Sequence, residues 1–118
     1  MGRLYDFRPE VKRQAFQRQW NRCGHCGHSL INQVDHAHHV IPHQSCLQQE
    51  RDNHFGASVE NCVLLCEMCH ERVHQDGRYR TGAVAPPDYY SYSHGPLSLE
   101  HRLWVSKIQH MWDRILQK

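Results

Sequence analysis

Apolar residues recur at helical spacing near both ends of the chain. Toward the N-terminus they are Val11, Ala15, Phe16 and Trp20, behind a proline and a glutamate that suit a helix start. Toward the C-terminus a stripe follows Ser98, a good N-cap residue. Its members are Trp104, Ile108, Met111, Trp112 and Ile115. The pattern predicts a helix over residues 9–20 and an amphipathic helix over 97–117, each packing by one face.

Between these helices the pattern changes to short segments. Residues 30–42 have strand character and end at a proline, and the apolar run at 62–65 predicts a second strand. Residues 66–74 then predict a helix, with Val73 as its main apolar contact. The polar stretch 43–60 and the stretch 75–96, rich in glycine, proline and tyrosine, predict irregular connections. The order strand, strand, helix between two flanking helices indicates an α+β fold in a single domain, 1–118.

Composition limits the classes of function that fit the chain. At 118 residues the domain buries only a modest core, and small domains often need a metal or disulfide staple. The formal net charge is +2, so affinity for a polyanion would depend on a local patch and a metal ion. The N-terminus does not resemble a signal peptide, and no apolar run is long enough to span a bilayer. We therefore expect cytoplasmic synthesis and no membrane association.

Four of the six cysteines fall into two C-x-x-C pairs, Cys23 with Cys26 and Cys66 with Cys69. Thiolates at this spacing reach one ion, and two such pairs complete the tetrahedral site that zinc prefers. A redox role is disfavoured because the chain lacks a thioredoxin-like βαβ pattern. The sequence predicts a structural Zn²⁺ that clamps the ends of the strand–strand–helix unit. Of the other two cysteines, Cys62 fits a buried strand thiol, and Cys46 is a loop thiol with no assigned role.

A second constellation consists of histidines. His70 and His74 lie one helical turn apart on one face, so both imidazoles can bind one divalent ion. His38 is the best candidate for a third ligand, and three protein ligands plus water form a catalytic site. His39 is then free to act as a general base. On a regular strand His36 shares a face with His38 and is an alternative ligand, whereas His39 needs a bulge or a strand end to serve the same site.

These residues together resemble the HNH endonucleases. The order and spacing that carry the resemblance are His38-His39-Val40-Ile41-Pro42, then Asn61, then Cys66-x-x-Cys69-His70 and His74. The cysteine pairs resemble the zinc-stapled branch of the family, and the lead-in from Arg8 is similar to that of prophage and toxin-associated members. The resemblance covers about residues 8–76 and leaves the loop 77–96 and the C-terminal helix uncovered.

The resemblance implies a small ββα-metal (His-Me finger) core that hydrolyses phosphodiester bonds in DNA. It implies a catalytic cation, Mg²⁺, Mn²⁺, Ni²⁺ or Zn²⁺, on His38, His70 and His74, contacting the scissile phosphate and the leaving 3′ oxygen. His39 would be the general base, and Asn61 would orient His39 or steady the hairpin.

Four arginines beyond the strands or along the helix are candidate phosphate contacts: Arg51, Arg72, Arg78 and Arg80. Phosphate contacts carry no sequence information, so we expect weak sequence specificity. The rival hypothesis is a zinc-binding module that binds nucleic acid or protein without cutting. Two roles fit a nuclease: an antibacterial toxin delivered by a secretion system and held in check by an immunity protein, or a phage or restriction-type nuclease.

Overall fold

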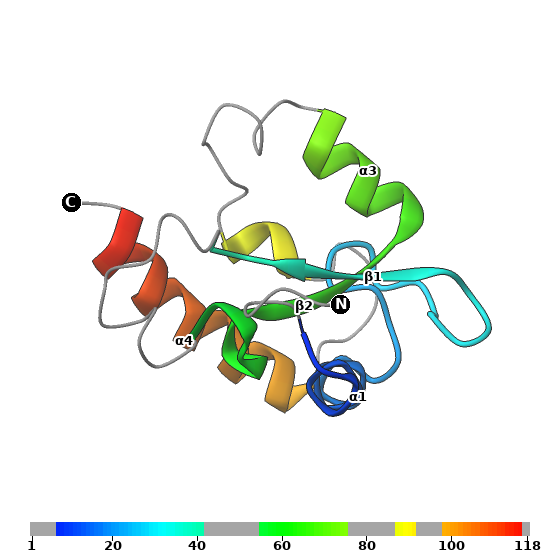
Figure 1. The fold of residues 1–118 in the computed structure, drawn as a ribbon, viewed down its shortest axis with the longest axis horizontal. Coiled ribbons are helices and arrows are strands. Elements are labelled where there is room, and N and C mark those ends of the chain that lie inside the picture. The colour runs from blue at the N-terminus through cyan, green and yellow to red at the C-terminus, as the bar shows by residue number, and fades with distance from the viewer. Residues whose placement is uncertain (1–6, 42–54, 76–86, 92–97, 117–118) are drawn as a thin grey trace.

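The computed structural model describes residues 7–41, 55–75, 87–91 and 98–116 (Figure 1). Within them, two antiparallel strands and three α-helices form a small α+β structure. The α-helices are α1 (Pro9–Arg18), α3 (Glu67–Gln75) and α4 (Leu99–Leu116), and the strands are β1 (Asp35–His39) and β2 (Cys62–Cys66). Three 3₁₀ turns complete the set: η2 (Phe55–Ala57), η3 (Val59–Asn61) and η4 (Pro87–Tyr90).

The two strands form a hairpin that carries α3 directly after it. β1 pairs with β2 in continuous register, from Asp35 opposite Cys66 to His39 opposite Cys62. In Figure 1, α3 lies on one side of the hairpin, and α1 and α4 lie on the other. The predicted order of strand, strand and helix is confirmed, as is the α+β class.

The N-terminal helix is shorter than its apolar pattern predicts. α1 ends at Arg18, and the next residues turn back through the left-handed conformations of Trp20 (φ 54°) and Asn21 (φ 60°). Trp20 is therefore 51% exposed, and its predicted place in the helical stripe is wrong. The physical reason is the turn itself, since the chain must reverse there to bring Cys23 beneath the hairpin.

Two polar side chains from the end of α1 hold the hairpin in place. Gln19, which is fully buried, accepts a hydrogen bond from the Leu64 N–H at 2.9 Å and donates to the Leu64 carbonyl at 2.9 Å. Arg18 donates to the carbonyls of Val59 and Cys62 and lies 4.3 Å over the Trp104 ring. The contacts to Cys62 and Leu64 satisfy backbone groups of β2 that a further strand would otherwise pair, and the contact to Val59 ties α1 to η3.

The predicted first strand is also shorter than expected. Residues 31–33 form a turn in which Asn32 has φ 60°, so regular pairing begins only at Asp35. The second strand and the helix after it match their predicted positions closely, and Cys62 is a buried strand thiol as expected.

The C-terminal helix begins and packs as its sequence predicts. The Ser98 hydroxyl accepts a hydrogen bond from the His101 N–H at 2.9 Å, which is an N-cap interaction. Trp104, Ile108, Trp112 and Ile115 are buried in the core. No helix in the described part of the chain is long and apolar enough to cross a bilayer.

Candidate metal centre and imidazole cluster

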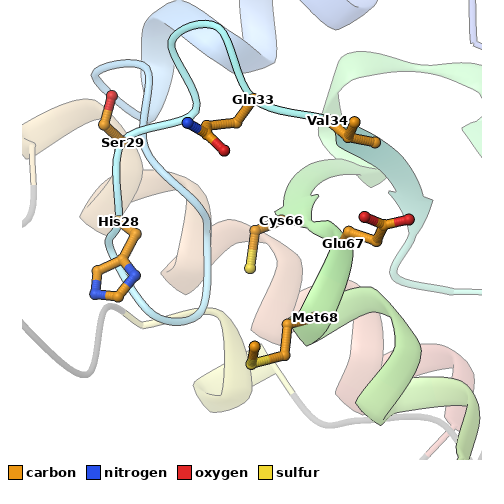
Figure 2. Close-up of a pocket in the computed structure, with 7 residues that line it drawn as sticks. All are labelled: His28, Ser29, Gln33, Val34, Cys66, Glu67 and Met68. Carbon is orange, nitrogen blue, oxygen red and sulfur yellow. The ribbon is translucent and has the colours of Figure 1, made fainter.

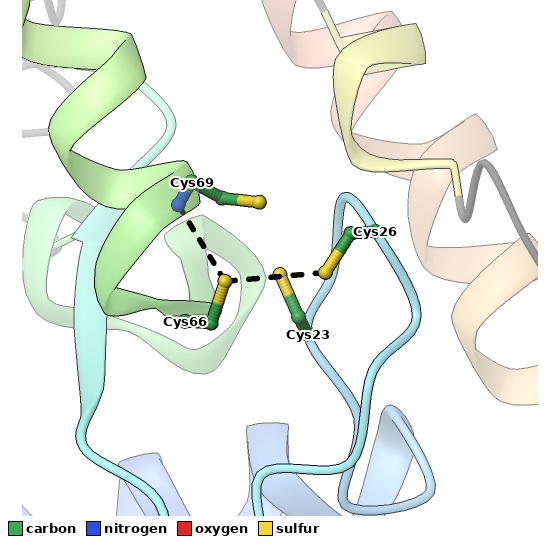
Figure 3. Close-up of side chains that lie close together, drawn as sticks. All are labelled: Cys23, Cys26, Cys66 and Cys69. Atoms are coloured by element: carbon green, nitrogen blue, oxygen red, sulfur yellow. Dashed lines mark hydrogen bonds between the residues drawn. The ribbon is translucent and has the colours of Figure 1, made fainter.

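The two C-x-x-C pairs meet at one end of the hairpin. Cys23 and Cys26 lie on the loop after α1, and Cys66 and Cys69 lie at the junction of β2 and α3; in Figure 3 the four sulfurs gather in one space. All four sulfur atoms lie within 4.8 Å of one another. Zinc–sulfur bonds of about 2.3 Å in a tetrahedron require sulfur–sulfur separations of about 3.8 Å. The Cys26–Cys66 separation is 3.9 Å, so the cluster fits a zinc ion.

The backbone around the cysteines has the hydrogen bonds of a metal knuckle. The N–H of His25 points at the Cys23 sulfur at 3.4 Å, and the N–H of Cys69 points at the Cys66 sulfur at 3.5 Å. Gly24 lies close against β2, where its N–H donates to the Leu64 carbonyl at 2.9 Å. A Cβ at this glycine would lie 2.4 Å from a Val63 methyl group, which is closer than any real contact.

The electrostatics of the cluster also favour a cation. Burial raises the pKa of the Cys26 thiol to about 11, and burial together with the nearby Cys23 raises the pKa of Cys69. Burial also acts to raise the pKa of Cys66, but hydrogen bonds from Cys69 and from neighbouring thiols outweigh it, so this pKa is lowered. Thiolates packed this closely would repel one another, and a bound divalent ion offsets that repulsion.

Three imidazoles cluster on the side of the hairpin that faces α3. His38 is 3% exposed, and its ring centroid lies 5.7 Å from that of His70 with the planes at 75°. His36 stacks on His70 from another direction, at 4.5 Å with the planes 8° apart. The strand alternation expected from the sequence is therefore present, because His36 and His38 share the face that meets α3.

The ring geometry separates the two candidate strand ligands. The lone pair of an imidazole nitrogen lies in the ring plane, so two rings stacked face to face cannot both direct lone pairs at an ion between them. This excludes His36 and His70 as a shared ligand pair in the present arrangement. The edge-on relation of His38 to His70 leaves their lone pairs free to converge, so His38 is the better ligand candidate.

His39 lies apart from this cluster. It is the last residue of β1, and its ring stacks on Phe7 with centroids 4.2 Å apart and planes at 22°. β1 is regularly paired throughout, so the two neighbouring histidines diverge from a strand end and not from a bulge within the strand. The two adjacent imidazoles thus face different surroundings.

Asn61 is fully buried and braces the chain just beyond β1. Its amide donates to the Ile41 carbonyl at 2.9 Å and accepts from the Ile41 N–H at 2.8 Å. Its own carbonyl accepts from the Val40 N–H at 3.1 Å. Of the two roles expected for Asn61, these contacts correspond to steadying the hairpin.

The structure describes only some of the other candidate site residues. Arg72 is exposed on α3. His74 belongs to α3, but its side chain is outside the described residues, as are Arg51, Arg78, Arg80 and Cys46.

The sequence patterns did not place three residues that contact histidines of the candidate site or of the cysteine knuckle. Tyr90 is fully buried, with its ring centroid 6.1 Å from that of His38, and Tyr89 stacks on His25 of the knuckle. Phe7 lies before the first helix, where no periodicity marks it. Consecutive tyrosines in a proline-rich stretch were the only available signal for η4.

A cavity of about 500 Å³ opens beside Cys66, with the imidazole of His28 in its lining (Figure 2). Its lining includes Gln33, Val34, Cys66 and Met68, and Glu67 contributes a carboxylate. This lining does not offer a phosphate the arginines or lysines that anion binding favours. His36, His38 and His70 are not among the residues that line this cavity.

No protein-family model matches the chain, and no curated protein matches it either.

Proposed function

We propose that the chain is a metal-dependent endonuclease of the HNH type, which hydrolyses phosphodiester bonds in DNA. The observation that carries the proposal is the edge-on placement of His38 against His70, across the interface of β1 and α3. The cysteine cluster at the foot of the same helix and the Asn61 brace after β1 support it further. This set of residues in this order resembles the HNH signature.

In this proposal His38, His70 and His74 hold the catalytic ion. His70 and His74 are four residues apart within α3, which places both on one helical face. If these residues held a divalent ion, it would supply electrostatic stabilisation for the negative charge that develops on the phosphate and on the leaving 3′ oxygen. Imidazole ligands suit Zn²⁺ and Ni²⁺, and Mg²⁺ or Mn²⁺ are the other candidates.

His39 is the proposed general base, which takes the proton of the attacking water. In-line attack requires the base and the leaving group on opposite sides of the phosphorus. Adjacent residues that diverge from a strand end, as His38 and His39 do, suit that requirement. The stacked ring of Phe7 restricts the orientation of the His39 imidazole.

Contacts to DNA would come from the phosphate backbone. Arg72 is exposed on the helix that carries His70, and we assign Arg51, Arg78 and Arg80 to the same task. A formal net charge of +2 gives little long-range attraction, so binding should be weakly sequence-specific and sensitive to salt. A role as an antibacterial toxin with an immunity protein, or as a phage or restriction-type nuclease, is compatible with this activity.

The test is cleavage of supercoiled plasmid by the zinc-loaded chain with each of the four ions, beside His39→Ala. We expect the substitution to lower the rate by about 10²–10⁴-fold, the usual contribution of a general base. His110→Ala, at an exposed histidine of α4, is the matched control and should cut normally. If the folded wild type cuts neither DNA nor RNA with any ion, a non-catalytic zinc-binding module becomes the better interpretation.

A further inference from the structure

Six aromatic rings form an unbroken row from the cysteine cluster to the imidazole cluster. The successive centroid separations are 3.9, 5.3, 6.1, 5.7 and 4.5 Å. In order, the row consists of His25, Tyr89, Tyr90, His38, His70 and His36. All these separations are within the range in which aromatic rings interact.

The first half of the row is tied to the cysteine cluster at two points. His25 lies between Cys23 and Cys26, and its Nδ1–H donates to the Tyr89 carbonyl at 2.6 Å. The Tyr89 hydroxyl donates to the carbonyl of Cys69 at 3.4 Å. Tyr89 therefore contacts both C-x-x-C elements, and a shift of either knuckle would displace it.

Tyr90 is held in place from the C-terminal helix. Its carbonyl accepts a hydrogen bond at 2.6 Å from Nε2–H of His101, which is fully buried. Burial lowers the pKa of His101 to about 4, so this imidazole is neutral at pH 7. Its backbone N–H is in turn fixed by Ser98, whose hydroxyl donates to the Arg18 carbonyl at 2.5 Å. The main chain of Tyr90 thus has little freedom to move.

The far side of Tyr90 meets His38, which has almost no exposed surface. Tyr90 and His70 flank the His38 ring, at 6.1 and 5.7 Å between centroids. A ring packed in this way takes its orientation from its neighbours, because protein interiors are close-packed. The direction of the His38 lone pair is therefore set in part by Tyr90.

We propose that Tyr90 is a positioning residue for His38, and that the Tyr89–Tyr90 pair couples the cysteine metal centre to ion binding at the imidazole cluster. The proposal rests on the proposed function, in that the imidazole cluster must bind an ion. Coupling of this kind is a difference in affinity at one site caused by the state of the other. The test therefore measures binding directly.

The first experiment is calorimetric titration of Ni²⁺ into the zinc-loaded full chain. Tyr90→Leu removes the ring and should weaken Ni²⁺ binding by about fivefold or more. Tyr90→Phe keeps the ring and should bind within about twofold of the wild type. Ile115→Ala, which truncates a buried residue near the end of α4, is the control for a general loss of stability.

The second experiment reports on the coupling itself. The cysteine centre is loaded with Cd²⁺, and its cadmium NMR resonance is followed while Zn²⁺ is added to the imidazole cluster. We expect the resonance to shift in the wild type and to respond much less in Tyr89→Leu, a substitution at a half-buried position.

The outcomes separate the two proposals. Equal Ni²⁺ affinity in folded Tyr90→Leu and in Ile115→Ala would overturn the positioning role and leave the ion site intact. If Tyr90→Leu does not fold, an undiminished cadmium response in Tyr89→Leu overturns the coupling. If the wild type takes up no Ni²⁺ beyond the cysteine centre, the imidazole ion site itself fails, and the inference fails with it.

Discussion

Replacing Asn61 with alanine tests the brace that holds the chain beyond β1. The side chain is fully buried and makes two hydrogen bonds to the backbone of Ile41, which is itself fully buried. Without the amide, one N–H and one C=O lose these partners in a water-poor environment. A buried polar group left unsatisfied costs about 1–3 kcal/mol, so the pair costs about 2–6 kcal/mol. Domains of this kind are stable by only about 5–15 kcal/mol in total.

The assay is urea unfolding followed by circular dichroism, at one fixed free zinc concentration because ligand binding shifts apparent stability. Gln19→Ala is the matched comparison, since the Gln19 amide makes the same pair of bonds to Leu64. Gln109→Ala removes an amide whose bond to Asp113 is exposed, and should change stability by less than about 0.5 kcal/mol. If Asn61→Ala unfolds at the same urea concentration as Gln109→Ala, the brace is not structural and the reasoning fails.

Three further predictions concern the metal, an isolated thiol and the proposed base. Removing zinc with EDTA should abolish most helicity. Structural zinc contributes about 10–16 kcal/mol, which is comparable to or greater than the stability of such a domain. Unchanged circular dichroism of the metal-free protein would contradict this. Burial raises the pKa of Cys62 from 9.0 to about 12, so the folded state keeps a proton that the unfolded state loses. The stability of the wild type relative to Cys62→Ala should therefore be constant below pH about 9 and fall by about 1.4 kcal/mol per pH unit between pH about 9 and about 12. A flat difference in unfolding free energy over this range would count against a buried neutral thiol. Phe7→Leu removes the stacked ring from His39 and should slow plasmid cleavage about two- to tenfold, from a stacking energy of about 0.5–1.5 kcal/mol, with zinc content unchanged; a full rate would show that Phe7 does not position the base.

The parts of the fold that the sequence predicts best are those in which local pattern and metal spacing agree. The apolar run 62–65 and the C-x-x-C pair that begins at Cys66 predict β2 and the start of α3 to within one residue. Ser98 marks the start of α4 because its hydroxyl performs the capping that its position suggests. In these cases the information lies within a few residues of the element.

The parts that the sequence does not predict depend on contacts between distant segments. Trp20 continues a helical pattern, yet the chain turns back at Trp20 and Asn21, directly after Arg18 and Gln19 bond to η3 and β2. Tyr90 lies in a stretch with loop composition, but it is buried against His38, 52 positions earlier in the chain, and bonded to His101 in α4. No periodicity within either segment encodes such pairings.

A two-stranded sheet is marginal by itself, and in the part of the chain that the structure describes polar side chains support this one. Gln19 occupies the backbone groups of Leu64, and Asn61 occupies those of Ile41. Gln19 binds β2 in the way that a neighbouring strand would, and Asn61 continues the contact between the two strand segments beyond the paired residues. Within the described residues the hairpin is held by these contacts without a third strand. His36 and His38 meet His70 on one face of this hairpin. The face of the hairpin that meets α3 is thus the place where histidines from a strand and from a helix come together.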